Sequence, residues 1–181
     1  MSQNLLIINS SPLSQGSKSR ALTETFSNEW QDKNPGVSVI ERDLSKTGLS
    51  HLDEATIGAF YTPEDQHNDD QKELVSLSNT LVGELIKADT IIIGAPMHNF
   101  SIPSILKSYI DLVARVGKTF SYTEEGPKGL LTGKKAYVLA ATGGDYREGS
   151  PASGMNFVDP YLRTVLGFLG ITDVALLRFV E

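Results

Sequence analysis

Short apolar runs alternate along this chain with longer amphipathic segments, and this alternation limits the fold more than any other feature. Residues 5–9 (LLIIN), 90–95 (TIIIGA) and 135–141 (KAYVLAA) are almost continuously apolar. Runs this short and apolar are typical of strands buried on both faces of a parallel sheet. Between the first two runs, leucines recur every three or four residues over positions 74–85, which predicts a helix. Strands that alternate with helices predict a doubly wound α/β fold with right-handed crossovers.

The complete pattern predicts a single domain over residues 1–181, with a five-stranded parallel sheet in the order 2-1-3-4-5. The strands are expected at residues 5–9, 37–42, 90–95, 135–141 and 173–180. The helices are expected at about residues 18–32, at 71–88, at a segment with Pro103 in its first turn, and at 160–170. Residues 43–70 read as a long loop with room for a short helix, and residues 120–132 as an irregular excursion.

This topology also predicts where a ligand would bind. In such a sheet the ligand lies beyond the carboxyl ends of the strands, near the switch between the first and third strands. Residues 9–19, 96–100 and 142–145 follow three of the expected strands and reach that edge. These three segments are therefore the candidates for a binding site.

The first segment, NSSPLSQGSKS, places five serines around a glycine directly before a helix: Ser10, Ser11, Ser14, Ser17 and Ser19. Free backbone N–H groups and the helix dipole favour a phosphate at such a position, and hydroxyls add donors without negative charge. Lys18 or Arg20 would add positive charge. The alternative is an ordinary helix cap with turn residues. The segment is neither a Walker loop nor GxGxxG, which disfavours a nucleoside triphosphate or a dinucleotide bound in the Rossmann manner.

The other two segments have side chains and backbone suited to a flat ring. Met97 and Phe100 would pack on such a ring while Asn99 bonds its polar edge, as a flavin requires. The alternative is that Met97 and Phe100 plug the core and Asn99 is a turn residue. Gly143 and Gly144 would let the backbone approach a ligand closely, although glycines also simply permit a turn.

Composition excludes several classes of function. A net charge of −6 argues against a general nucleic-acid binder. The absence of cysteine excludes disulfides, thiol nucleophiles and cysteine metal sites, and the three widely spaced histidines make a histidine-rich metal site improbable. Neither a signal peptide nor an apolar stretch of about 20 residues is visible. We therefore expect a cytoplasmic protein with no metal, no nucleic-acid partner and no membrane partner.

From Met97 onward the sequence closely resembles a known family. The block PMHNFSIPSILKSYIDLVARVGKTFSYTEEGPKGLLTGKKA is similar to the FMN-dependent NADH azoreductases, which are related to the NAD(P)H:quinone oxidoreductases. The likeness extends from LLIINSS through PYLRTVLGFLGITDV, nearly the whole chain. It implies a flavodoxin-like three-layer sandwich and a homodimer with one FMN per subunit at the dimer interface.

The resemblance also implies a set of site residues. The FMN phosphate would be held by Ser11, Ser17 and Ser19, together with the backbone of Lys18. The isoalloxazine ring would be lined by Pro96, Met97, His98, Asn99 and Phe100, and its polar edge contacted by Ala141, Thr142, Gly143 and Gly144. Tyr122 and Phe168 would form the wall of the substrate pocket over the flavin, with core aromatic packing as the alternative for both.

The chain departs from the family pattern at four places. His98 stands where a tyrosine is common, and Ala141 and Thr142 stand where a Ser-Arg pair can occur. Residues 145–157 form a slightly longer segment than usual. The sequence stops at Glu181, directly after the last expected strand, so the final helix of the family is expected to be absent. That absence would bear on the stability of the last strand and on the dimer.

The implied function is transfer of two electrons from NADH or NADPH through FMN to quinones and azo compounds, by a ping-pong mechanism. The flavin performs the redox step, so no nucleophile–base pair is required. His98 is a candidate to donate a proton or hydrogen bond to the acceptor, and a position on the rim or against a flavin carbonyl is an equal alternative. A flavodoxin-type electron carrier without its own substrate is the rival function. Asn9-Ser10 and Ala95-Pro96 stand where a signalling receiver needs acidic residues, which argues strongly against that function.

Overall fold

A single five-stranded parallel sheet organises the computed structural model, which describes residues 3–180. Its strands are β1 (Asn4–Asn9), β2 (Ser38–Asp43), β3 (Thr90–Pro96), β6 (Lys135–Thr142) and β7 (Asp173–Val180). They lie in the order β2-β1-β3-β6-β7, and every neighbouring pair is parallel. Counted along the sheet's own strands, this is the order 2-1-3-4-5, so the predicted topology is confirmed. Asn9 at the end of β1 aligns with Asp43 of β2 and Gly94 of β3.

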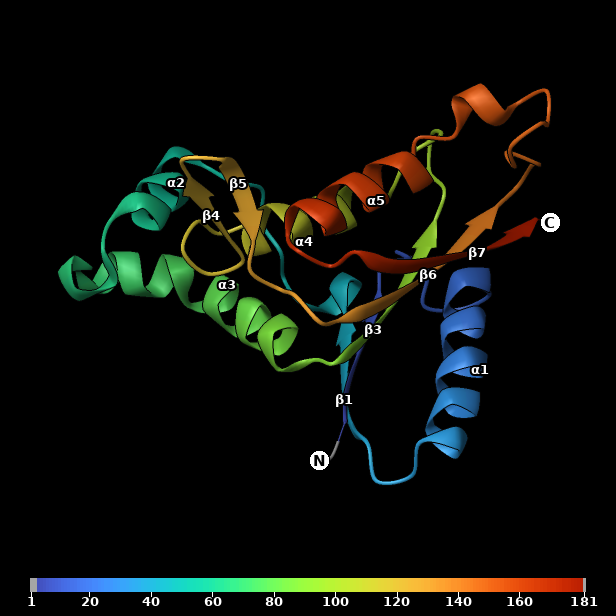
Figure 1. Ribbon diagram of the computed structural model, residues 1–181, viewed down its shortest axis with the longest axis horizontal. Coiled ribbons are helices and arrows are strands. Elements are labelled where there is room, and N and C mark those ends of the chain that lie inside the picture. The colour runs from blue at the N-terminus through green and yellow to red at the C-terminus, as the bar shows by residue number, and fades with distance from the viewer. Residues whose placement is uncertain (1–2, 181) are drawn as a thin grey trace.

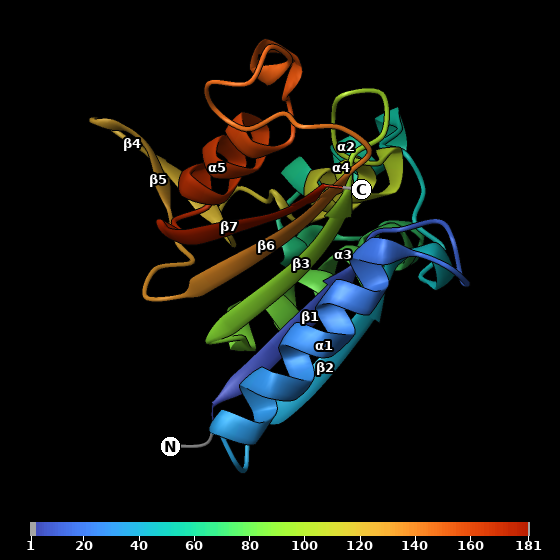
Figure 2. The same cartoon turned by 90° about the vertical axis from the view of Figure 1, so that its right-hand side faces the viewer.

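Helices cover the two faces of the sheet unequally (Figures 1 and 2). They are α1 (Lys18–Lys33), α2 (Glu54–Tyr61), α3 (Asp69–Lys87), α4 (Ser104–Val113) and α5 (Asp159–Phe168). In Figure 1, α1 lies alone on one side, and α3, α4 and α5 lie on the other. The larger buried cluster fills the space between the sheet and these three helices, whereas a smaller cluster around Leu5, Ile7, Ile92 and Leu139 lies under α1.

Local sequence signals set the helix boundaries. Asn68 caps α3 and forms a reciprocal capping box with Gln71, so α3 begins two residues before the predicted start. Pro103 is the residue before α4 rather than a member of its first turn, because its ψ of 145° is extended. The long connection between β2 and α3 contains α2 and two short 3₁₀ turns, η1 (Leu44–Lys46) and η2 (Glu64–Gln66), and a third, η3 (Ser153–Met155), precedes α5.

Residues 120–132 are not wholly irregular, and that prediction was wrong. They contain an antiparallel hairpin of β4 (Phe120–Thr123) and β5 (Gly126–Gly129). The buried Phe120 ring packs on Phe168, with centroids 4.6 Å apart. Gly129 touches the backbone of Gly170 so closely that an added Cβ would lie 2.1 Å from the Gly170 nitrogen. Contacts with the end of α5, rather than local propensity, therefore hold the hairpin.

The last strand is fully paired but unevenly covered. Every residue of β7 has a partner in β6. On the α5 side, Val174 and Leu176 pack against the large cluster. On the α1 side, Leu177 and Phe179 are 38% and 45% exposed. Glu181, where the sequence stops, lies outside the described residues.

Candidate functional site

A cleft of about 260 Å³ lies at the carboxyl ends of β1, β3 and β6. Parallel strands all deliver their following loops to this edge, so three segments far apart in sequence meet here. The cleft is lined by Ser11, Leu13, Gly16, Ser17, Lys18, Ser19, Pro96, Met97, His98, Ala141, Thr142 and Gly143. All of these residues except Ala141, which directly precedes the third segment, come from the three segments that the topology had singled out.

The serines of the first segment have different roles. Ser17 is the N-cap of α1: its hydroxyl accepts a hydrogen bond from the Arg20 amide at 3.3 Å and lies 3.2 Å from the Ser19 hydroxyl. The buried Ser10 donates to the carbonyl of Gly94 at 2.6 Å and does not line the cleft. Ser11, Ser17 and Ser19 thus present hydroxyls beside the start of a helix, where an anion is favoured.

Gly94 brings α1 against the sheet. A Cβ at this position would lie 2.7 Å from Thr23 Cγ2 and 3.3 Å from the Ser19 carbonyl, so a larger residue would push the helix away. Thr23 in turn donates to Asn9 Oδ1 at 2.6 Å. These contacts place the first turn of α1 directly beside the end of β3.

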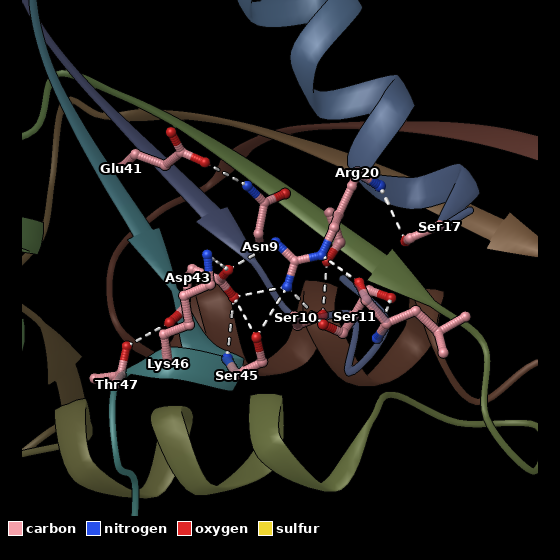
Figure 3. Close-up of polar contacts among 12 residues, drawn as sticks. Asn9, Ser10, Ser11, Ser17, Arg20, Glu41, Asp43, Ser45, Lys46 and Thr47 are labelled. Carbon is pink, nitrogen blue, oxygen red and sulfur yellow. Dashed lines mark hydrogen bonds and ion pairs between the residues drawn. The ribbon is translucent and has the colours of Figure 1, made fainter. Parts of the chain in front are cut away.

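Arg20 does not face the cleft. Its guanidinium donates to the carbonyls of Ser11 and Leu13 at 2.8 and 2.7 Å, and to both carboxylate oxygens of Asp43 at 2.7 and 2.9 Å (Figure 3). The hydrogen bonds from Arg20 lower the pKa of Asp43 to about 2. Arg20 is thus paired with a carboxylate, and of the two basic residues named from the sequence, Lys18 and Arg20, only Lys18 lines the cleft.

The second segment is a tight turn with unusual backbone angles. The amide of His98 donates to the Ser101 carbonyl at 2.9 Å, and the amide of Ser101 returns a bond of 3.0 Å. Between them, Asn99 and Phe100 have φ values of 48° and 70°, which residues other than glycine rarely adopt. Neither residue lines the cleft, although both directly follow His98, which does. The Met97 amide donates to the Ala141 carbonyl at 2.8 Å, which ties this turn to the third segment.

The third segment supplies backbone and space. Thr142 donates to the carbonyl of Gly144 at 2.8 Å, which closes the turn after β6. Gly143 lines the cleft and has no neighbouring atom within 4 Å of the position of a Cβ. Gly144 lies instead under the ring of Tyr146, and that ring also meets the edge of Phe100, with centroids 6.3 Å apart. Part of the longer segment 145–157 therefore packs on the second segment.

Two predicted site residues, Tyr122 and Phe168, lie elsewhere in the fold. Tyr122 is on the β4–β5 hairpin and Phe168 ends α5, and both contact the ring of Phe120. The hairpin leads into the amino end of β6, and α5 leads into the amino end of β7. Both residues are therefore at the opposite end of these strands from the cleft.

Sequence reasoning missed several residues that build the cleft. Of these residues, Gly94 was the easiest to predict from the sequence, because an isolated glycine in a strand indicates a close approach of another backbone. Gly16, with a φ of 68°, directly precedes the capping serine and could have been found in the same way. Leu13, Asp43 and Tyr146 carry no comparable signal. Within residues 3–180, no group of three His, Asp or Glu side chains is placed to hold a metal ion, and no helix is long and apolar enough to cross a bilayer.

Comparison with known proteins gives the family. The family model described as flavodoxin-like fold matches residues 3–181. An FMN-dependent NADH:quinone oxidoreductase of Hydrogenovibrio crunogenus is 53% identical over 174 residues, which cover 96% of this chain and 86% of the relative. The chain belongs to the family of FMN-dependent NADH:quinone oxidoreductases.

Solved structures of azoreductases have the same fold as this protein. An azoreductase of Bacillus anthracis str. Sterne is 29% identical with a TM-score of 0.90, over 98% of this chain and 86% of that one. An FMN-dependent NADH-azoreductase of Bacillus anthracis str. Ames Ancestor, solved in complex with FMN, is 26% identical with a TM-score of 0.89, over 98% and 87%. The resemblance noted from the sequence is confirmed.

Proposed function

We propose that the protein is an FMN-dependent oxidoreductase that transfers two electrons from NADH or NADPH to quinones and azo compounds. The names of its relatives support this activity and this cofactor. One observation carries the proposal. Hydroxyl groups at the start of a helix, the apolar end of a strand and a glycine-containing turn all line the same cleft. We further propose that residues 1–181 act as one FMN-binding domain, in the cytoplasm, where reduced nicotinamide is available.

The residues present fit the phosphate end of FMN. Ser11, Ser17 and Ser19 offer hydroxyl donors, and the Lys18 amide lies in the first turn of α1, where the helix dipole favours negative charge. Arg20 is not assigned to this role, because its guanidinium forms an ion pair with Asp43.

The apolar and glycine-rich parts of the cleft fit the ring end. Pro96 and Met97 would line one side of the isoalloxazine, with His98, Asn99 and Phe100 around it. Ala141, Thr142, Gly143 and Gly144 would contact its polar edge through their backbone, and the open space at Gly143 supports a close approach. When bound, FMN supplies the two-electron redox chemistry, which amino-acid side chains lack. The roles left to the chain are binding, orientation of both substrates and hydrogen bonding, the last with His98 as a candidate donor to the acceptor.

We propose a homodimer in which each cleft is completed by the partner subunit. The cleft, at about 260 Å³, is smaller than typical small-molecule and cofactor sites, which span roughly 300–1,000 Å³. Tyr122 and Phe168 lie at the wrong end of their own subunit to cover it. In a twofold dimer they would instead cover the partner's flavin. Donor and acceptor would then use the same covered face in turn, which is a ping-pong order.

The test is spectroscopic. Purified protein, or apoprotein mixed with FMN, should be yellow and should bleach when NADH is added without oxygen. Addition of a quinone should then restore the colour, and steady-state rates should give parallel double-reciprocal lines. Bleaching only by a separate protein reductase would favour an electron carrier. A protein that FMN cannot reconstitute would refute the proposal.

Two serine variants test the phosphate assignment. Ser17→Ala removes a hydroxyl of the cleft, and we expect it to weaken FMN binding. Ser14→Ala is the matched control, because Ser14 is in the same loop but lines the opposite groove, between α1 and β2. Equal FMN affinity in the two variants would count against the assignment.

A further inference from the structure

The loop that carries the candidate phosphate site has little support from its own backbone. Within the described part of the chain, no backbone–backbone hydrogen bond holds residues 11–16. Ser11 accepts a hydrogen bond on its side chain from the Leu13 amide, at 3.3 Å, but this bond is internal to the loop. An external contact is needed to fix such a loop in one conformation.

Arg20 provides that contact. Its side chain crosses from α1 to the loop and donates to two of the loop's carbonyls, those of Ser11 and Leu13. The same guanidinium donates to both carboxylate oxygens of Asp43, from Nη1 and Nη2, and its Nη2 also lies 3.1 Å from the hydroxyl of Ser45. A planar guanidinium satisfies acceptors in several directions at once, which a lysine ammonium does not reproduce.

Asp43 is itself held in place by its neighbour Ser45. It ends β2, and its carboxylate accepts hydrogen bonds from the amide and hydroxyl of Ser45 at 3.1 and 2.8 Å (Figure 3). The side chains of Arg20 and Asp43 are only 19% and 15% exposed, so solvent screens the pair weakly. The loop is thereby tied to the sheet through α1 and β2.

From this arrangement we infer that the Arg20–Asp43 pair is a positioning device that holds the serine loop in its phosphate-accepting form and so selects FMN over unphosphorylated riboflavin. The inference rests on the proposed function. Neither residue lines the cleft, so both act through the loop residues Ser11 and Leu13 rather than by contact with the cofactor. A loop already fixed in its bound form loses less conformational entropy on binding, and each 1.4 kcal/mol saved raises affinity tenfold.

The test compares two flavins that differ only in the phosphate. Apoprotein is titrated with FMN and with riboflavin, and binding is followed by flavin fluorescence. For Arg20→Lys and Asp43→Asn we expect the Kd for FMN to rise roughly tenfold or more, with the Kd for riboflavin nearly unchanged. Arg147→Lys is the matched control, because Arg147 forms an equally short ion pair with Asp145 in an exposed loop, and we expect it to alter neither value.

The outcomes separate this inference from the proposed function. A wild-type protein that binds no FMN refutes both. Wild-type binding with unchanged FMN affinity in the variants refutes only the inference. Equal weakening of both flavins also refutes it, because that pattern reflects general destabilisation. If Asp43→Asn does not fold, Ser45→Ala disturbs the same network more gently and must give a smaller shift of the same kind.

Discussion

Two consecutive residues that directly follow His98, Asn99 and Phe100, have left-handed backbone conformations. Asparagine tolerates this region, whereas for phenylalanine it costs about 1–2 kcal/mol. Burial does not offset this cost, because Phe100 is 44% exposed and its ring meets another aromatic side chain, Tyr146, only at the edge. Strain of this kind concentrates where a side chain is needed for function. We therefore interpret Phe100 as a residue retained for the flavin or the acceptor.

Replacement by glycine should separate stability from function at this position. For Phe100→Gly we expect the free energy of unfolding of the apoprotein to rise by about 1 kcal/mol, because glycine adopts a positive φ freely. Quinone reductase activity should fall at the same time. Urea unfolding and steady-state kinetics measure the two effects, with Asn99→Gly as the control that gains less. A loss of stability in Phe100→Gly would contradict the interpretation.

Asp43 should make the free energy of unfolding depend on pH in the acidic range. Its pKa is about 2 in the folded protein, chiefly through the hydrogen bonds from Arg20, against about 3.9 in an unfolded chain. A depressed pKa contributes stability that is complete above about pH 5 and is lost as the pH falls from about 4 through 2. The charged groups that face it, Arg20 and the exposed Lys46 at 3.7 Å, stay protonated throughout. We expect the urea midpoint to fall less steeply below pH 5 in Asp43→Asn than in the wild type. Parallel slopes would show that Asp43 is not responsible.

At the scale of elements, the sequence predicted those helices and strands whose apolar residues follow a regular period. The strands of the main sheet and the long helices were found within a few residues, because their apolar residues repeat at the period of the element. The β4–β5 hairpin was not, because GPKG is short, contains a proline and has no apolar alternation. Its stability comes from contacts with residues of α5 and the loop after it, some 40 positions later, such as Gly170. A local pattern carries no trace of such contacts.

The same limit applies to the candidate site. Topology placed the three segments at one edge, and resemblance named the residues of the cleft. Neither could tell that Arg20 turns toward Asp43, because the direction of a long side chain depends on which acceptors the fold brings near. Nor could they tell that the residues in the second segment's turn are left-handed, since its sequence has no glycine.

The hairpin's close contact yields a direct prediction. An added methyl group at Gly129 would lie 2.1 Å from the Gly170 nitrogen and 2.4 Å from its Cα, and neither backbone can yield without moving a strand or a loop. We expect Gly129→Ala to lower the free energy of unfolding by about 1–3 kcal/mol. Gly167→Ala is the control, because this helical glycine has open space and alanine favours the helix by roughly 0.5–1 kcal/mol. Thermal unfolding of the two variants should shift in opposite directions.

At the scale of the whole molecule, the proposed dimer predicts complementation between defective subunits. Tyr122→Ala would impair the cleft of the partner subunit, whereas Ser17→Ala would impair the cleft of the subunit that carries it. A mixed dimer of the two variants would then contain one cleft with both parts intact. Unfolding and refolding an equimolar mixture should therefore recover about a quarter of the wild-type active sites, since half of the random dimers are mixed and each has one intact site. Activity that merely averages that of the two variants would place Tyr122 in its own subunit's site.

The interior position of β1 in the sheet, between β2 and β3, has a consequence for the synthesis of the chain. This strand is made first, yet one of its edges pairs with β2, which ends at residue 43, and the other with β3, which begins at residue 90. At about 5–20 residues per second, the second edge waits several seconds for its partner to leave the ribosome. An apolar strand with an open edge pairs readily with other chains during that time. We therefore expect the yield of native protein to depend on how fast residues 44–96 are translated, so that codon choice in this stretch affects solubility without changing the finished fold.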